Sequence, residues 1–180
     1  MARYSILTKE GHKEGKLPKG WRLLSPSPAR PPRPRPLGVM LEEALRRPIG
    51  TPPLEEMLPP AGRIALLVDD LTRPTPKREI LPLLLEKLQQ RGVGPERVEI
   101  VVALGTHRQL SSEELKEALG DGIVKRYPTV NHDPFSQDLC PVGRLSMGST
   151  VKINRAVHEA ALRISLGSIL PHPMAGFGGG

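Results

Sequence analysis

The stretch that decides the fold reads RIALLVDDLTRPTP and runs from Arg63 to Pro76. Its first half is a run of aliphatic side chains without alternation, which indicates a strand buried on both faces of a sheet. Two aspartates end the run, and the threonines and prolines after them predict a turn. A buried strand that opens into a polar turn is typical of α/β proteins, whose ligands bind beyond the carboxyl ends of parallel strands.

The chain after this stretch alternates between helical and strand patterns. Leucines at helical spacing over residues 75–92 predict a helix with Thr75 as its N-cap. A second helix over residues 111–120 begins with a capping box of Ser111 and Glu114. Further strands are expected at residues 97–105, 129–131 and 162–170, with a strand-to-helix passage at 151–161. The alternation predicts a Rossmann-like α/β fold with a largely parallel sheet and flanking helices.

The first third of the chain has a different composition. Twelve of the 21 prolines fall within residues 1–60, and half of these twelve lie in the stretch SPSPARPPRPRP of residues 25–36. Such a stretch runs extended, either as a solvated connector or as a ligand of the SH3 type. We expect residues 1–24 to form a hairpin or arm, residues 25–60 the proline-rich connector and a short helix, and residues 61–180 the α/β domain.

The net charge of +7 does not indicate a nucleic-acid partner, because of where the charge lies. Residues 1–60 carry 11 lysines and arginines against 6 acids, while residues 61–180 carry 15 against 13. No basic stripe is interleaved with aromatic residues, which make up 3% of the chain. The single cysteine excludes a disulfide within the chain, and no apolar run approaches the ~20 residues of a membrane span. We expect a cytoplasmic protein that binds neither nucleic acid nor membranes.

Polar clusters follow three of the expected strands. In the first, Asp70 and Arg73 stand three residues apart, so both can face one point in a tight turn. The arginine suits a carboxylate or a phosphate; alternatively, the two side chains pair with each other and pin the next helix. In the second, GTHRQ, Gly105 permits a sharp turn that presents His107 at the edge of the sheet.

The third cluster, PHPMAGFGGG, holds His172 between two prolines, and its glycines let a ligand approach the main chain. A disordered tail is the alternative interpretation. Two histidines that flank one site suit a reaction at a carbon approached from both faces, with each imidazole serving one hand of the substrate. His132 in NHDP fits a turn better than a ligand, and His158 is expected to face solvent.

These clusters, in this order, resemble the nickel-pincer lactate racemase family. The likeness covers residues 49–180, which correspond to the N-terminal domain of that family. It is carried by six motifs: PIGTPPL, DDLTRPTP, GTHR followed by SSEEL, NHDP, VKINR and GSILPHPMAGFGGG. The resemblance implies an isomerase that interconverts the two hands of a 2-hydroxy acid such as lactate. It also implies a nickel pyridinium-3,5-bisthiocarboxylate mononucleotide that accepts and returns a hydride.

The resemblance implies roles for particular residues. His107 and His172 match the family's acid and base, which act on the substrate hydroxyl rather than on a carbon-bound proton. Arg73 faces the substrate carboxylate. The residues implied in cofactor binding are Asp70, Leu71, Thr72, Arg73, Gly178 and Gly179.

In the family, the glycine run leads to a lysine that bonds to the cofactor, then to a histidine that ligates nickel and to a C-terminal domain. None of these precedes Gly180. We therefore expect this chain alone to be inactive, to contain no nickel ligand, and to need the missing domain or a partner chain. An exposed interdomain surface also predicts self-association into homo-oligomers. Two alternatives are a non-catalytic nucleotide- or anion-binding domain and an interaction module that uses residues 25–36.

Overall fold

A computed structural model describes residues 3–8, 11–22, 35–172 and 176–179. The chain divides into two compact units, Met1–Arg35 and Pro36–Gly180. In the first unit, β1 (Arg3–Thr8) and β2 (Gly11–Lys16) pair as an antiparallel hairpin. Residues 23–34 of the proline-rich stretch lie outside the described residues, so both of its interpretations and the expected domain boundaries stay predictions.

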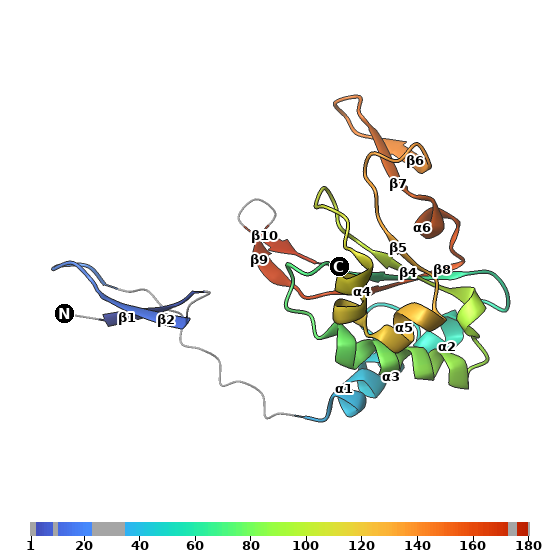
Figure 1. The fold of residues 1–180 in the computed structure, drawn as a ribbon, viewed down its shortest axis with the longest axis horizontal. Coiled ribbons are helices and arrows are strands. Elements are labelled where there is room, and N and C mark those ends of the chain that lie inside the picture. The colour runs from blue at the N-terminus through green and yellow to red at the C-terminus, as the bar shows by residue number, and fades with distance from the viewer. Residues whose placement is uncertain (1–2, 9–10, 23–34, 173–175, 180) are drawn as a thin grey trace. The chain divides into compact units, whose positions relative to one another are not determined.

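The second unit is built on a four-stranded parallel sheet with the strand order β5-β4-β3-β8. Its strands are β3 (Ile64–Val68), β4 (Val98–Val102), β5 (Thr129–Asn131) and β8 (Leu162–Leu166). One face is covered by α1 (Leu37–Arg46), α2 (Leu54–Met57), α3 (Lys77–Gln90), α4 (Ser112–Leu119) and α5 (Asp121–Arg126) (Figure 1). The predicted α/β fold with a parallel sheet and flanking helices is confirmed.

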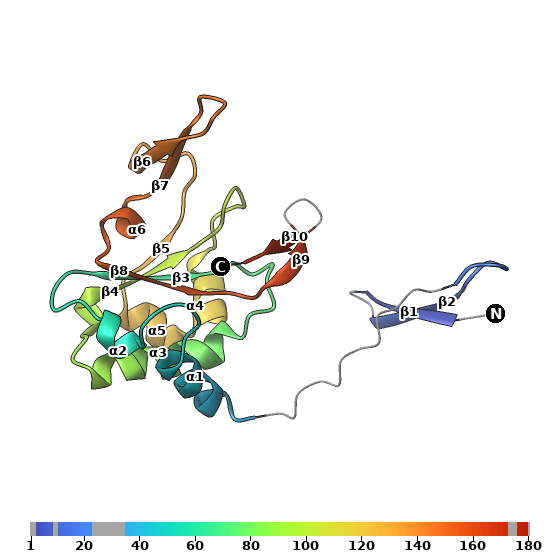
Figure 2. The same ribbon diagram turned by 180° about the vertical axis from the view of Figure 1, so that it is seen from behind.

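The connection between β5 and β8 lies on the other side of the sheet, as the view from behind shows (Figure 2). It consists of an antiparallel hairpin of β6 (Leu139–Arg144) and β7 (Thr150–Asn154), followed by α6 (Arg155–Glu159). A second small hairpin, β9 (Leu170–His172) with β10 (Gly176–Gly178), follows β8. A 3-10 turn, η1 (Pro95–Arg97), leads into β4. Within the described ranges, no helix is both long and apolar enough to span a bilayer.

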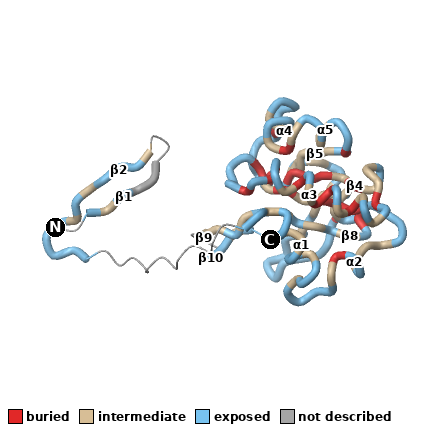
Figure 3. Tube along the Cα trace, turned by 90° about the horizontal axis from the view of Figure 1, so that it is seen from below, coloured by how far each residue is buried: buried red, intermediate tan, exposed pale blue. Residues whose placement is uncertain are grey.

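The core lies between the sheet and α3, where the buried residues gather (Figure 3). Ile64, Leu66 and Ile100 of the sheet are fully buried, as is Leu81 of α3. Each side chain of this size contributes about 1.5–3 kcal/mol when it leaves water. The low aromatic content therefore costs the fold little, because branched aliphatic residues fill the space between helices and strands.

Two local predictions were wrong. Thr75 does not cap α3; the helix begins at Lys77 after Pro76, without a side-chain cap, and the Thr75 hydroxyl is used elsewhere. The last strand ends at Leu166, not at Leu170, and the four residues beyond lead into the β9–β10 hairpin. The capping box of α4 is confirmed, since Ser111 and Glu114 each accept a hydrogen bond from the other's backbone amide.

Candidate functional site

The carboxyl ends of β3, β4 and β8 meet at one edge of the sheet, because the three strands run parallel and in register. Residues 69–76 follow β3 and residues 103–110 follow β4, as the sequence predicts. The third exit differs, since Gly167 and Ser168 follow β8 directly and His172 lies on the hairpin beyond them. Ligands of parallel α/β sheets bind at this edge, so the candidate site is built from these loops.

Asp70 joins the first two loops. Its carboxylate is 6% exposed and accepts hydrogen bonds from the backbone amide of Thr72 at 2.9 Å and from the Thr72 hydroxyl at 2.6 Å. The other carboxylate oxygen pairs with Nδ1 of His107, whose side chain is 53% exposed. The structure therefore brings together three of the predicted site residues from two separate loops.

The charge of Asp70 decides which nitrogen of His107 carries a proton. Burial raises the pKa of the Asp70 carboxyl, but the hydrogen bonds from Thr72 and His107 outweigh it and hold the pKa below its ordinary value. An ionised carboxylate only accepts hydrogen bonds, so Nδ1 of His107 donates to it. In the neutral ring, Nε2 then keeps its lone pair and can accept a proton.

Two further contacts hold the loop that carries His107. The Asn131 side chain donates to the carbonyl of Leu110 at 2.9 Å and accepts from its amide at 3.3 Å. Arg108 forms a bidentate ion pair with Glu114 at 2.5 and 2.7 Å, and this pairing lowers the pKa of Glu114 to about 2. Arg108 thus anchors the loop to α4.

Arg73 lines a cleft of about 270 Å³ at the sheet edge. The lining also includes Asp69, Ala103, Ser168 and Gly179. Arg73 is exposed, and its guanidinium has no carboxylate partner among the described residues, because the Asp70 carboxylate binds Thr72 and His107 instead. Asp70 and Arg73 therefore do not form the ion pair that was the alternative interpretation. The Arg73 guanidinium is available to bind an anion.

A polar network at this cleft was not predicted from the sequence. The Asp69 carboxylate accepts hydrogen bonds from Lys77 Nζ at 2.7 Å, from the Thr75 hydroxyl and from the Ser168 amide at 3.3 Å. Lys77 also donates to the carbonyl of Asp70 at 2.9 Å. The sequence contained one signal of this network, which is Lys77 in the first turn of the helix. A lysine there is repelled by the helix dipole, so a nearby carboxylate is expected to bind it.

His172 and the two predicted glycines lie on or beside the β9–β10 hairpin. His172 pairs with Gly176 across the hairpin, and its ring lies beside Gly178. Gly179 has a positive φ of 111°, and a Cβ at this position would lie 2.4 Å from the Ser168 carbonyl oxygen. Glycine is thus required where the chain passes close to the exit of β8. The convergence of His172 and His107 on one substrate stays a prediction.

The remaining predicted residues lie as follows. Leu71 is 44% exposed at the tip of the first turn. His158 is exposed, as expected. His132 extends β5, with its amide bonded to the Val102 carbonyl, and its Nδ1 is buried without a partner among the described residues.

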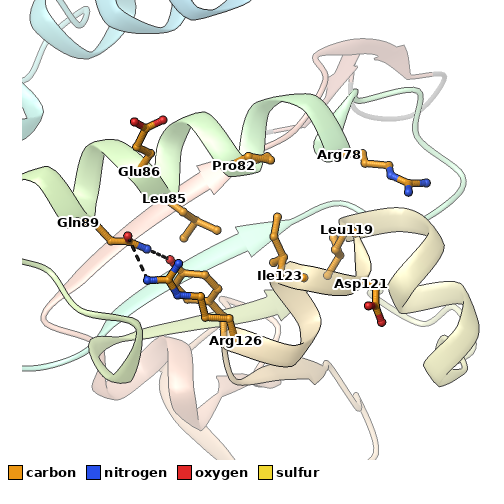
Figure 4. A pocket seen from close by; sticks show the side chains of 12 residues that line it. Arg78, Pro82, Leu85, Glu86, Gln89, Leu119, Asp121, Ile123 and Arg126 are labelled. Atoms are coloured by element: carbon orange, nitrogen blue, oxygen red, sulfur yellow. Dashed lines mark hydrogen bonds between the residues drawn. The ribbon is translucent and has the colours of Figure 1, made fainter.

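A larger hollow of about 700 Å³ lies on the helical side, between α3 and α5 (Figure 4). Leu85 and Ile123 form part of its wall, and Arg126 and Gln89 hydrogen-bond at one end. None of the predicted site residues lines it. We assign the site to the smaller cleft, because it lies at the strand ends and Arg73 and Gly179 line it. Asp70 and His107 belong to the loops of the same sheet edge but are not among the residues that line this cleft.

Comparisons with known proteins show to which family the chain belongs. The family model of the lactate racemase N-terminal domain matches residues 10–180. The chain is 35% identical over 142 residues to a lactate racemase of Thermoanaerobacterium thermosaccharolyticum and 39% identical over 142 residues to one of Lactiplantibacillus plantarum. Each match covers 78% of this chain and 33% of the relative.

A solved structure is also similar, that of the lactate racemase apoprotein from Thermoanaerobacterium thermosaccharolyticum. The TM-score is 0.79 at 29% sequence identity, over 99% of this chain and 42% of that one. The chain spans about a third of the length of the curated relatives that it matches. With the family model matching almost the whole sequence, the chain belongs to the family of lactate racemase N-terminal domains.

Proposed function

We propose that this chain supplies the acid–base residues of a 2-hydroxy-acid racemase of the lactate type. The observation that carries the proposal is the Asp70–His107 pair at the edge of the sheet, on the same turn after β3 as Arg73, whose guanidinium has no carboxylate partner in the described part of the chain. An oriented imidazole beside an anion-binding side chain is what a small hydroxy acid needs for recognition and deprotonation. Two curated relatives are named as lactate racemases, which supports this substrate class.

The chain's own residues would act as follows. Arg73 binds the substrate carboxylate and so fixes the position of the hydroxyl group. Nε2 of His107 accepts the hydroxyl proton of one enantiomer, while Asp70 holds Nδ1–H and stabilises the imidazolium that forms. His172 does the same for the other enantiomer. Formation of an enantiomer reverses its oxidation, so the histidine that accepts the hydroxyl proton of one enantiomer donates a proton when that enantiomer is formed, and the other histidine protonates the product of the opposite hand.

The cleft has features that suit an anionic mononucleotide. Arg73 offers a guanidinium to a phosphate, and Gly167 and Gly179 line the cleft with main chain and no side chain. When bound, the nickel-pincer nucleotide supplies the acceptor and donor of the hydride at the substrate carbon. Asp70, Leu71, Thr72, Arg73, Gly178 and Gly179 are the residues that we propose to hold it.

The groups that complete the reaction come, in this proposal, from outside the described residues. Among the residues that the structure describes, no group of three or more His, Cys, Asp or Glu side chains could hold a metal ion. By the resemblance to the family, we propose that the nickel ligand and the covalent anchor of the cofactor belong to a further domain or a partner chain. The isolated 180 residues are then inactive, and the complete protein is cytoplasmic.

The test uses the protein as its gene encodes it, loaded with the nickel nucleotide and mixed with each enantiomer of lactate in turn. The wild-type protein racemises both. A single turnover of the His107→Gln variant is expected to oxidise only one enantiomer to the keto acid, and His172→Gln only the other, because each variant keeps one base. His158→Gln, at an exposed position on α6, serves as the control.

Two results would reject the proposal. If either variant oxidised both enantiomers at the wild-type rate, the two histidines would not be the bases. If the loaded wild-type protein bound the mononucleotide but racemised no 2-hydroxy acid, the chain would belong to the non-catalytic anion-binding class instead.

A further inference from the structure

The strongest unexplained feature of the molecule is a buried lysine where a helix begins. Lys77 is 4% exposed and occupies the first position of α3. The N-terminus of a helix carries partial positive charge, so a lysine is unfavourable there, and a buried lysine costs more. An apolar side chain would fill the same space in the core. We therefore look to the two hydrogen-bond partners of Lys77 Nζ for the reason that a lysine stands here.

Both partners belong to the turn after β3. Lys77 Nζ donates to the Asp69 carboxylate at 2.7 Å and to the carbonyl of Asp70 at 2.9 Å. The second bond holds the backbone of the residue whose carboxylate pairs with His107. Lys77 therefore reaches the proposed base through a single intervening residue, Asp70. Its ammonium group binds the Asp70 main chain, and the Asp70 side chain binds the imidazole of His107.

The same network ties the turn to the exit of β8. The Asp69 carboxylate takes the Thr75 hydroxyl and the Ser168 amide as well as Lys77, and the Thr75 hydroxyl lies 2.7 Å from that of Ser168. The turn after β3 and the start of α3 thus meet the exit of β8 at one carboxylate, although Ser168 lies 99 residues from Asp69. Asp69 and Ser168 also line the cleft beside Arg73, so the network forms part of the cleft wall.

We propose that Lys77 is a positioning residue: through the Asp69 carboxylate and the Asp70 carbonyl, it sets the orientation in which Asp70 holds His107. The role of His107 as a base belongs to the proposed function, on which this inference rests. The orientation itself can be measured without any catalysis.

The experiment compares Lys77→Met with the wild-type protein as its gene encodes it. Imidazole nitrogen NMR, with His107 assigned from the His107→Gln spectrum, reports which ring nitrogen carries the proton. In the wild type, the proton of His107 is expected at Nδ1; in Lys77→Met, the two tautomers are expected to mix. Turnover of lactate falls about 10- to 100-fold while KM changes less than about threefold, because Arg73 still binds the carboxylate.

Two further variants separate positioning from stability. Lys77→Met leaves the Asp69 carboxylate without its cation, so Tm is expected to fall by about 10 °C. The double variant Lys77→Met with Asp69→Asn removes the unpaired charge and is expected to recover at least half of that loss, but neither the tautomer nor the turnover. Lys87→Met is the matched control, since Lys87 lies on the same helix and pairs with Glu42 near the surface.

The outcomes are distinct. An unchanged His107 tautomer in Lys77→Met overturns the inference, whatever happens to Tm. Recovery of tautomer and turnover together with Tm in the double variant also overturns it, because Lys77 would then act only through stability. Absence of racemisation by the wild-type protein would reject the proposed function alone, and the NMR comparison would still decide the role of Lys77.

Discussion

The two candidate histidines stand on segments that are held in different ways. His107 lies on a loop that is bonded to Asp70, to Glu114 through Arg108, and to Asn131 through Leu110. His172 lies on a hairpin of two three-residue strands. The parallel sheet and its loops position the first imidazole, whereas the second depends on a much smaller unit.

The apolar side chains of the hairpin underline this difference. Ile169 is 74% exposed and Phe177 is 67% exposed. A two-stranded hairpin is marginally stable by itself in water. The orientation of the His172 imidazole therefore depends on contacts that cover these apolar side chains. The comparison teaches that a folded domain can hold one candidate histidine by contacts from several elements, while another depends on a hairpin with few contacts of its own.

The largest effect is expected from a substitution that removes the hydrogen bond between Asp70 and His107. Asp70→Asn places an amide beside Nδ1 of His107, which favours the tautomer with the proton on Nε2 and so removes the base. Turnover of lactate is expected to fall by about 10²- to 10⁴-fold. Steady-state kinetics measure this, with Asp121→Asn as the control, because Asp121 forms an exposed ion pair with Lys125. A loss of less than about threefold in Asp70→Asn would show that the pair does not orient the base.

The second prediction concerns the other side and compares two glycines of positive φ. In Gly179→Ala, the new methyl group would meet the Ser168 carbonyl oxygen, so the segment must leave the exit of β8. Amide exchange at residues 170–172 and 176–178 is expected to quicken about tenfold or more. Gly176→Ala is the control, since its Cβ would point into open space and only the backbone strain remains. Equal exchange in the two variants would mean that the contact at Ser168 does not hold the hairpin.

The third prediction uses pH. The pKa of Asp70 lies below its ordinary value of 3.8 in the folded protein, so its ionised form stabilises the fold above about pH 4. That contribution is lost as the pH falls through the folded pKa. Urea unfolding between pH 6 and pH 3 is therefore expected to show a steeper loss of stability in the wild type than in Asp70→Asn. Parallel curves would contradict the ionised, hydrogen-bonded carboxylate.

The smallest effect is expected at the anchor of the His107 loop. Glu114→Gln removes the charge that pairs with Arg108, but glutamine can still accept the Ser111 amide of the capping box. Because the ion pair is exposed and screened by water, Tm should change by less than about 2 °C and turnover by less than about twofold. Thermal unfolding and kinetics test this. A tenfold loss of turnover would make Arg108 a part of the site rather than an anchor.

Much of the sheet could be predicted because its sequence signals are local. The aliphatic runs at Ile64–Val68 and Val98–Val102 are long enough to specify buried strands. The rule that ligands bind at the carboxyl ends of such strands then selected Asp70 and His107, and the structure joins these two side chains.

The parts that failed depend on contacts between distant residues. The Thr75 hydroxyl looked like a helix cap, but Asp69 and Ser168 compete for it more strongly than the amides of the first turn. Ser168 lies 93 residues away, and no local pattern announces such a partner. The end of β8 was misplaced for a similar reason, because the aliphatic residues after Gly167 belong to the approach to a separate hairpin.

The pairing of β3 with β4 places Val68 opposite Val102, and this register limits which insertions and deletions the two strands can tolerate. Asp70 follows Val68 by two residues and His107 follows Val102 by five. The register of the two strands therefore sets the distance between the two side chains that form the hydrogen bond. An insertion within either strand would shift one side chain by a rise of about 3.3 Å and reverse its face. The helices can drift in sequence, and the loops on the far edge can lengthen, but these two strands must keep their length for the pair to survive.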